Sequence, residues 1–412
     1  QLYAQGRKLL QRFDPVAAQK VLARVVEAEP DYPLGHLALS DALLALGREA
    51  EARREIRRAF ELSGPLPRAA RSLIEARYHE APGQWQKAFA LYRALRIALP
   101  DDPEYGLYLT EAQRRAGLPD EALRTVAELR RLSTRVADDP RLELAAAKAQ
   151  MDLSDFAAAV GVIDRAVAQA EAAASPLLLA QALLLDSFAR ANLNQHQRAL
   201  RSAERARDLF AAAGDLSGQG EAMIAASSAH IALGDYARAE QVQEQTLQVL
   251  IGLGNSVLTA AHLGNMADLL CLRGKLELAA ARAQAGLLLS QEVGNREATL
   301  QSLVMLAQVA LLRGNLARSA QLLAQAQQEL PSPDDPRMSA WVSWHLAELR
   351  RAQGRADEAA RLHRLALAKR EEYHLVGFSA ESQVALAALS LTTPPTASPT
   401  ASPAALIDSA EY

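Results

Sequence analysis

The chain has 412 residues, of which 50% are hydrophobic and 23% are charged, so it holds enough apolar side chains for a large core. Its net charge of −3 argues against a nucleic-acid-binding protein, which usually carries a surplus of basic residues. The single cysteine, Cys271, excludes an intrachain disulfide and a cysteine-based zinc cluster, and no apolar run approaches the roughly 18 residues of a membrane-spanning helix. Aromatic residues make up only 5%, so alanine and leucine dominate the apolar content, which favours helices.

The beginning of the sequence carries its own expectation. It starts at Gln1 rather than at a methionine, and no signal-peptide pattern precedes the first predicted helix. We therefore expect a fragment of a longer protein. Arginine far outnumbers lysine and alanine is abundant, which is typical of a GC-rich bacterial genome. In a bacterium the fragment would be periplasmic if it follows a transmembrane anchor, and cytoplasmic otherwise.

Short turns recur along the chain at a nearly constant interval. The intervals are 36, 34 and 37 residues, and then 40 residues five times. Together with a further turn near residues 12–14, they predict about ten helix–turn–helix units. Most turn residues are glycine, which ends a helix at low cost in the left-handed conformation. The turn residues are Gly47, Gly83, Gly117, Ser154, Asn194, Gly234, Gly274, Gly314 and Gly354.

A second set of turns runs in phase with the first. Gly214, Gly254 and Gly294 are also 40 residues apart, and Asp334-Asp335 falls at the next interval. We expect these turns to separate one unit from the next.

Small residues occupy two fixed positions around each turn. Small side chains at both positions let the two helices of a unit approach closely and pack ridges into grooves. Five residues after the turn stand Ala52, Ala88, Ala122, Ala159, Ala199, Ala239, Ala279, Ser319 and Ala359. Seven residues before it stand Ser40, Ala76, Thr110, Ala147, Ser187, Ser227, Ala267, Ala307 and Ala347.

The end of the array has a different pattern. Residues 372–391 keep a helical spacing of apolar side chains, and they are predicted to form a helix that caps the last unit. Residues 392–412 begin with a Pro/Ser/Thr-rich stretch that predicts an extended tail. The expected organisation is units of 34–37 residues over 1–154, units of 40 residues over 155–371, the capping helix and the tail.

Several stretches resemble tetratricopeptide repeats. Residues 29–33 (Glu-Pro-Asp-Tyr-Pro) and 46–52 (Leu-Gly-Arg-Glu-Ala-Glu-Ala) look like that family's inter-repeat proline, first helix and turn, and Trp85 to Phe89 with Tyr92 and Pro100 look like its second helix. The resemblance covers roughly residues 1–371. It implies an all-α, right-handed superhelical solenoid whose first helices line a concave groove that binds a protein or peptide. The family's large aromatics are mostly replaced here by Leu, Ile and Ala.

A narrower resemblance is to the C-terminal repeat region of bacterial receptor serine/threonine kinases. The order of features that carries it is residues 2–6 (Leu-Tyr-Ala-Gln-Gly), 60–63 with 73–78, 100–102 with 105–107, and 138–141. It implies the sensory or scaffolding part of a larger signalling protein. Similar arrays follow winged-helix regulators, so a homotypic dimerisation module of a transcription regulator is one alternative, and a stand-alone adaptor is another.

Motifs for catalysis, cofactors and metals are not found in the sequence. It has no phosphate-binding loop, dinucleotide fingerprint, HExxH or nucleophile elbow, and no two histidines have His-x3-His spacing. We therefore expect no enzyme activity of this fragment, no cofactor, no metal, no nucleic acid and no membrane contact. The Asp-Asp-Pro triplets at 101–103, 138–140 and 334–336 are interpreted as helix N-caps, and Cys271 as a buried small residue. The family's Lys/Asn clamp for chaperone tails is absent, because no lysine is followed four residues later by Asn.

The resemblance also selects candidate ligand-binding residues. Counting back from each turn, positions thirteen, ten, nine and six should face the groove, and arginines near the helix ends should border it. The middle of the groove would then be apolar, which is typical of an interaction site, unless the superhelix or a homodimer contact buries it. One tryptophan of the last unit could instead pack into the neighbouring unit. The candidates are Tyr108, Glu111, Arg114, Leu184, Phe188, Ile224, Asn265, Met305, Trp341, Trp344, His345, Glu348 and Arg351.

Overall fold

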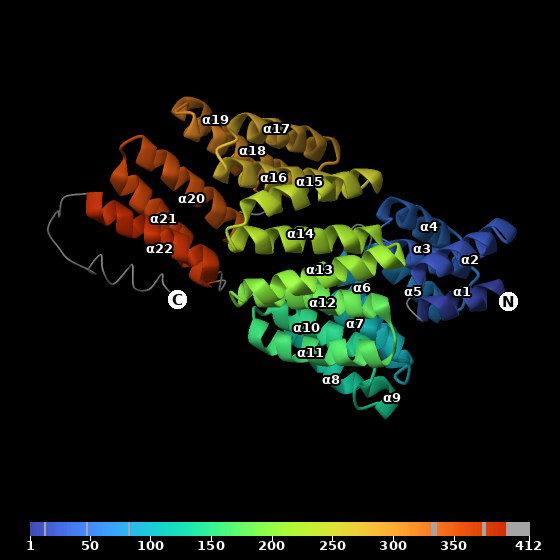
Figure 1. The fold of residues 1–412 in the computed structure, drawn as a ribbon. Coiled ribbons are helices and arrows are strands. Elements are labelled where there is room, and N and C mark those ends of the chain that lie inside the picture. The colour runs from blue at the N-terminus through green and yellow to red at the C-terminus, as the bar shows by residue number, and fades with distance from the viewer. Residues whose placement is uncertain (12–13, 47, 81–82, 331–335, 373–375, 393–412) are drawn as a thin grey trace. The chain divides into compact units, whose positions relative to one another are not determined.

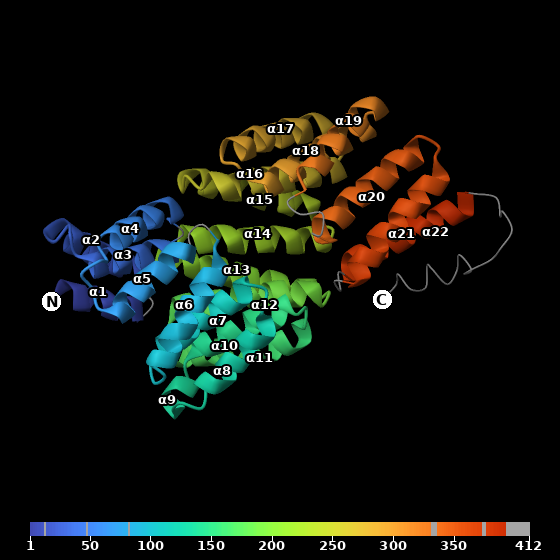
Figure 2. The same cartoon turned by 180° about the vertical axis from the view of Figure 1, so that it is seen from behind.

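The structure, a computed structural model, describes residues 1–11, 14–46, 48–80, 83–330, 336–372 and 376–392. Every regular element within these residues is a helix, as predicted. Figures 1 and 2 show, within each of two compact parts of the chain, successive helices packed side by side. None of the helices in this described part is long and apolar enough to cross a membrane.

The helices form ten pairs, each made of a first helix, a short turn and a second helix. A single-turn helix that the repeat pattern does not predict, α9 (Thr134–Ala137), separates the fourth and fifth pairs, and α22 (Val376–Thr392) follows the tenth pair and packs against its second helix. The pairs are α1 (Leu2–Gln11) with α2 (Pro15–Ala28), α3 (Pro33–Ala45) with α4 (Glu49–Glu61), α5 (Arg68–Glu80) with α6 (Trp85–Ala98), α7 (Pro103–Arg115) with α8 (Pro119–Leu129), α10 (Pro140–Asp152) with α11 (Phe156–Ala172), α12 (Pro176–Asn192) with α13 (His196–Ala213), α14 (Leu216–Ala232) with α15 (Tyr236–Gly252), α16 (Ser256–Leu272) with α17 (Leu276–Glu292), α18 (Arg296–Leu312) with α19 (Leu316–Gln328), and α20 (Pro336–Ala352) with α21 (Ala356–Glu372).

The chain divides into two compact units, Gln1–Val242 and Gln243–Tyr412. The division falls inside α15, so it coincides with no turn and with none of the segment boundaries expected from the sequence. The two units are described separately below.

Left-handed backbone conformations occur at the turns that the spacing predicts. Within the pairs, φ is positive at Gly83, Gly117, Ser154, Asn194, Gly234, Gly274, Gly314 and Gly354. Between pairs, it is positive at Ala174, Gly214, Gly254 and Gly294. Ala174, with a φ of 48°, is not predicted, because an alanine adopts this conformation only at an energetic cost. Gly47 and Asp334-Asp335 lie outside the described residues.

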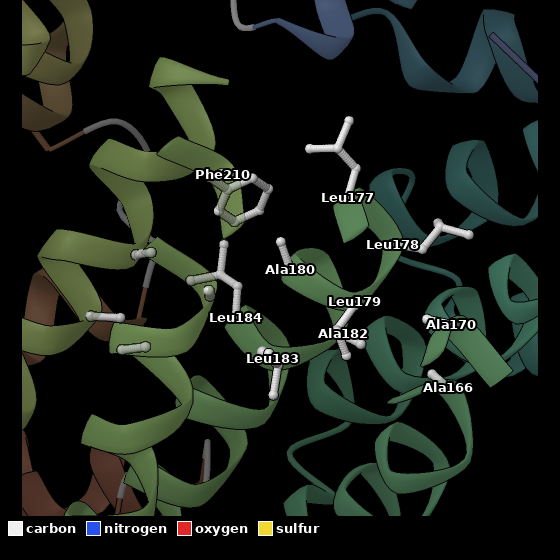
Figure 3. Packing of buried hydrophobic residues seen from close by; sticks show 14 of the residues in the cluster. Ala166, Ala170, Leu177, Leu178, Leu179, Ala180, Ala182, Leu183, Leu184 and Phe210 are labelled. Atoms are coloured by element: carbon white, nitrogen blue, oxygen red, sulfur yellow. The ribbon is translucent and has the colours of Figure 1, made fainter. Parts of the chain in front are cut away.

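The small residues flanking each turn are buried where the paired helices meet. All eighteen of the predicted positions are at most 2% exposed. Larger side chains pack with further small residues between helices: Leu178 and Leu183 of α12 belong to one apolar cluster with Ala166 and Ala170 of α11, and Figure 3 shows Leu178 on the side of α12 toward Ala170. Burying one leucine contributes about 1.5–3 kcal/mol, so packing between helices, rather than helix propensity alone, stabilises each unit.

Two of the three Asp-Asp-Pro triplets begin a helix as predicted. The side chain of Asp102 accepts a hydrogen bond from the backbone N–H of Glu104, and that of Asp139 accepts one from Arg141. Pro103 and Pro140 start the respective helices, where a missing backbone N–H costs nothing. In the third triplet Pro336 starts α20, while its two aspartates lie outside the described residues, as do residues 393–412 of the expected tail.

Candidate functional site

The first helices of the pairs expose one regular stripe of side chains. Residues thirteen, six and two positions before the turn are half-buried or exposed on α7, α10, α12, α14, α16, α18 and α20. Position ten is buried on α12, α16 and α18, where it packs into the core. We call the residues at positions thirteen, six and two, together with the exposed Asn265 at position nine of α16, the first-helix face. Position two was not among the positions predicted from the sequence. It lies eleven residues after position thirteen, which is about three helical turns, so the two positions share one side of the helix.

Burial removes three predicted residues from this surface. His345 is 5% exposed; Leu184 is 7% exposed and Met305 is 1% exposed, and these two belong to apolar clusters inside the array. Ile224 is half-buried, whereas the Phe188 ring is 38% exposed at position six. The apolar strip expected along the middle units therefore lies largely in the core, because the apolar side chains at positions nine and ten point toward neighbouring helices.

In the first unit, a ladder of ion pairs joins successive first helices. Arg77 of α5 pairs with Asp41 of α3, and within its own helix it also pairs with Glu80 at 2.5 Å. Further along, Arg141 of α10 lies 2.8 Å from Glu104 of α7. The two pairs between helices join residues 36 and 37 positions apart, so the repeat itself places opposite charges beside each other.

The predicted residues of α7 belong to this ladder. Arg114 donates to Glu111 at 2.8 Å and to Asp152 of α10 at 3.0 Å, so it is engaged within the protein. Burial alone would raise the pKa of Glu111, but the hydrogen bonds from Arg114 and the charge of Lys148 lower it to about 2. Tyr108 lies under the guanidinium of Arg77, 5.4 Å from the ring centre, and burial raises its pKa to about 12.

In the second unit, the first-helix face is made of amides and leucines. Gln301 of α18 donates from Nε2 to Oδ1 of Asn265 on α16, at 2.6 Å. The side chains at position two are apolar, and Leu272 and Leu312 are 59% and 50% exposed. Asp268 at position six of α16 is also exposed. Apart from Asp268, this part of the face combines uncharged hydrogen-bonding groups with exposed apolar groups.

On α20, the predicted residues do come together. The ring of His345 is perpendicular to both tryptophans, 5.2 Å from Trp341 and 4.8 Å from Trp344. Trp344 also lies 6.3 Å from His363 of α21, so it points toward the second helix of its own pair. Arg351 donates to Glu348 at 2.7 Å. Arg351 is exposed, Trp341, Trp344 and Glu348 are half-buried, and His345 is buried.

The repeat geometry agrees with the family comparison. Residues 9–71 match a family model described as tetratricopeptide repeat. The pairs that follow repeat the same turns and the same buried small residues. The chain therefore has the fold of a tetratricopeptide-repeat array.

Solved structures with the same arrangement share little sequence with this tetratricopeptide-repeat array. A Rap protein complexed with competence and sporulation factor has a TM-score of 0.58 at 12% identity, over 90% of this chain and 98% of that one. Aspartyl phosphate phosphatase F from Bacillus subtilis has a TM-score of 0.52 at 14% identity, over 81% and 94%. These likenesses establish the fold alone.

A longer neighbour matches over part of its length. It is a signal transduction ATPase with numerous domains and a tetratricopeptide-repeat sensor, from Pyrococcus horikoshii, with a TM-score of 0.55 at 13% identity. The match covers 76% of this chain, which spans about half (52%) of that ATPase. No curated protein matches the tetratricopeptide-repeat array in sequence.

Metal-binding side chains and a nucleophilic thiol are the groups that could support chemistry in the array. Within the described segments, no three His, Cys, Asp or Glu side chains are grouped closely enough to hold a metal ion. Cys271 is half-buried, and burial together with Asp268 raises the pKa of its thiol to about 11. The reactive thiolate is therefore strongly disfavoured at neutral pH.

Proposed function

We propose that the array is a protein- or peptide-binding module and that an extended peptide lies along the first-helix face of the second unit. The observation that carries this proposal is the row of amides beside exposed leucines on α16 and α18. An amide side chain has both a donor and an acceptor, so it can pair with the N–H and C=O of a peptide backbone whatever its sequence. Leu272 and Leu312 would contribute apolar contact beside these hydrogen bonds.

The existing contact between Gln301 and Asn265 supports this reading. Their hydrogen bond at 2.6 Å holds both amides in place across two neighbouring helices, with Asn265 exposed and Gln301 half-buried. Also on α18, Gln308 Oε1 lies 3.2 Å from Nδ1 of His345 on α20, which positions a third amide. Pre-positioned groups lose less conformational entropy when a ligand binds, so they give more affinity than free side chains would.

We further propose that the array is the sensory or scaffolding part of a larger signalling protein. Two structural neighbours support this role: the signal transduction ATPase whose tetratricopeptide repeats are described as a sensor, and the Rap protein complexed with competence and sporulation factor. A peptide-binding face would give such a part its input, because a ligand that contacts several pairs at once favours one arrangement of them.

The test starts from a random peptide library displayed on phage and selected on the whole chain. The selected peptides are titrated against the parent and against a double variant, Asn265→Ala with Gln301→Ala. We expect the variant to bind at least about tenfold more weakly, a loss of about 1.4 kcal/mol.

A matched variant provides the control. Gln325→Ala with Gln327→Ala removes two exposed amides from α19, a second helix, and should leave the affinity unchanged. Equal affinities for all three proteins would place the bound peptide elsewhere and refute the proposed face.

A further inference from the structure

The first unit contains a pocket that the proposed peptide face does not use. Its volume is about 620 Å³, within the range of small-molecule sites. Its lining residues come from α3, α4, α5, α6, α7 and α10. Figure 2 shows α5, α6, α7 and α10 one after another. Four cationic residues line the pocket: Arg53, Arg77, Arg115 and Lys148. The carboxylates in the lining are two, Glu80 and Glu111.

Most of these charges are already paired with each other. Arg77 is bound by Asp41 and by Glu80, and Glu80 also accepts the Tyr92 hydroxyl at 2.5 Å. Arg115 donates to Glu111 at 3.0 Å. These pairs use both of the pocket's carboxylates.

The cationic side chain of Lys148 belongs to none of these ion pairs. It is half-buried on α10, and it takes part in no hydrogen bond or ion pair with the residues that the structure describes. Burial and the neighbouring charges of Arg114 and Arg115 lower its pKa below the ordinary value for lysine, and the carboxylates Glu111 and Glu221 offset this only in part. A half-buried ammonium group with no directly bound anion is unfavourable, and an anion that pairs with it would remove that cost.

The rest of the lining is apolar or aromatic. The Trp85 indole is half-buried, and the Arg115 guanidinium lies 5.7 Å from the ring centre. Ile56 is buried in the pocket lining, and Leu44 is 41% exposed there. An aromatic and aliphatic surface beside a basic group fits a ligand with an apolar body and one acidic group.

We propose that this pocket binds an organic carboxylate whose carboxyl group pairs with Lys148 and Arg115 and whose apolar body contacts Trp85, Leu44 and Ile56. The same chemistry is offered by a free small acid and by the C-terminal residue of a short peptide. The pocket shares no residue with the proposed peptide face on α16 and α18. Either proposal can therefore be correct if the other is refuted.

Phenylacetate is the first probe, because it joins a carboxylate to an aromatic body. Binding is followed by the emission of Trp85 in a chain that carries Trp341→Phe and Trp344→Phe, and by isothermal titration calorimetry of the parent. We expect phenylacetate to bind, and the neutral isostere phenylacetamide and inorganic phosphate to bind at least about tenfold more weakly. The dipeptide Ala-Phe and its C-terminal amide distinguish the two sources: a preference for the free dipeptide over both its amide and phenylacetate assigns the site to a peptide terminus.

Lysine variants test the role of the ammonium group. Lys148→Gln should weaken phenylacetate binding at least about tenfold, while Lys20→Gln, which changes an exposed lysine of α2, should not. Without ligand, Lys148→Gln should melt at the same temperature as the parent or higher, since it removes an unpaired half-buried charge. A purely structural role would lower the melting temperature instead.

The pH dependence provides an independent readout. Because only the charged lysine attracts the carboxylate, affinity should fall as the pH rises through the lowered pKa of Lys148, and Lys148→Arg should bind without that fall. Equal binding of phenylacetate and phenylacetamide would overturn the proposal. So would phosphate binding as tightly as phenylacetate, or full affinity in the Lys148→Gln variant.

Discussion

At the scale of single residues, burial decides which candidate side chains can carry a charge. His345 is 5% exposed, and burial lowers its pKa to about 3. Its ring contacts are with two tryptophans, so it is held as a neutral aromatic group at neutral pH. The helical spacing correctly predicted that His345 lies beside Trp341 and Trp344. It could not predict that His345 is buried, because burial depends on how α20 packs against α18 and α21.

His345 predicts an acid sensitivity of the second unit. In the unfolded chain a histidine takes up its proton near pH 6.5, whereas the folded protein resists protonation here until about pH 3. The unfolded state therefore binds more protons between these values, and this residue lowers stability as the pH falls from about 6.5 to 3, by up to about 1.4 kcal/mol per pH unit. His345→Phe keeps an aromatic ring without a titrating group and should flatten that part of the profile, measured by chemical denaturation at several pH values.

The control is Val342→Ala, which changes a buried side chain without a titrating group on the same helix. That variant should lower the whole stability profile without changing its slope between about pH 3 and 6.5. An unchanged slope in His345→Phe would mean that the ring is accessible to protons in the folded protein.

At the scale of helices, the close approach within each pair depends on small residues at fixed positions. Ala279 of α17 is fully buried, and it belongs to a cluster with Leu270 of α16 and Val309 of α18. Three helices meet at this methyl group. A larger side chain would have to push one of them away.

Ala279→Leu is therefore expected to destabilise the protein by about 1–3 kcal/mol through overpacking. Ala285→Leu is the matched substitution on the same helix, at an exposed position, and it should change stability by less than about 0.5 kcal/mol. Denaturant midpoints of both variants against the parent provide the measurement. Equal midpoints for all three would show that the buried position of Ala279 has been wrongly assigned.

The sequence predicted the helix pairs well because their signals are local. Glycines such as Gly234 and Gly274 define the turns through backbone conformation, and Asp102 defines a helix start through its own side chain. Ala174 lies at a turn that local signals did not predict. Its left-handed conformation is imposed by the two helices it joins, and alanine is not a turn-forming residue. The single turn α9 is likewise a tertiary adjustment between two pairs.

The candidate site could be predicted only in part, for the same reason. The repeat period identified which helices come first in each pair and so which side of the array carries Asn265 and Glu348. It did not separate position ten from position six, because both are often apolar here, as Leu184 and Phe188 are. Only the packing of each helix against both neighbours shows that the first is buried and the second exposed. The pocket around Lys148 combines six helices, and no sequence spacing describes it.

At the scale of the molecule, each pair is stabilised mainly by contacts with its neighbours, as in other repeat proteins. The last pair has a helix, α22, in place of a further neighbour. Arg370 of α21 donates to Ser382 of α22 at 2.9 Å, and Ala387 and Leu389 of α22 are buried. Without α22, the apolar surface that these side chains cover would face water.

Truncation separates the role of α22 from that of the tail. Deleting residues 376–412 should destabilise α20 and α21, move the tryptophan emission to longer wavelength, and raise quenching by acrylamide, because Trp341 and Trp344 lie on α20. Deleting only residues 393–412 should leave both signals as in the parent. Hydrogen exchange would locate the effect: amides of α20 and α21 should exchange faster in the longer truncation while those of α1 to α8 keep their rates, since a pair responds mainly to its own neighbours. Faster exchange spread evenly over both units would show instead that the array unfolds as one cooperative body, and identical exchange in both truncations would show that α22 does not cap it.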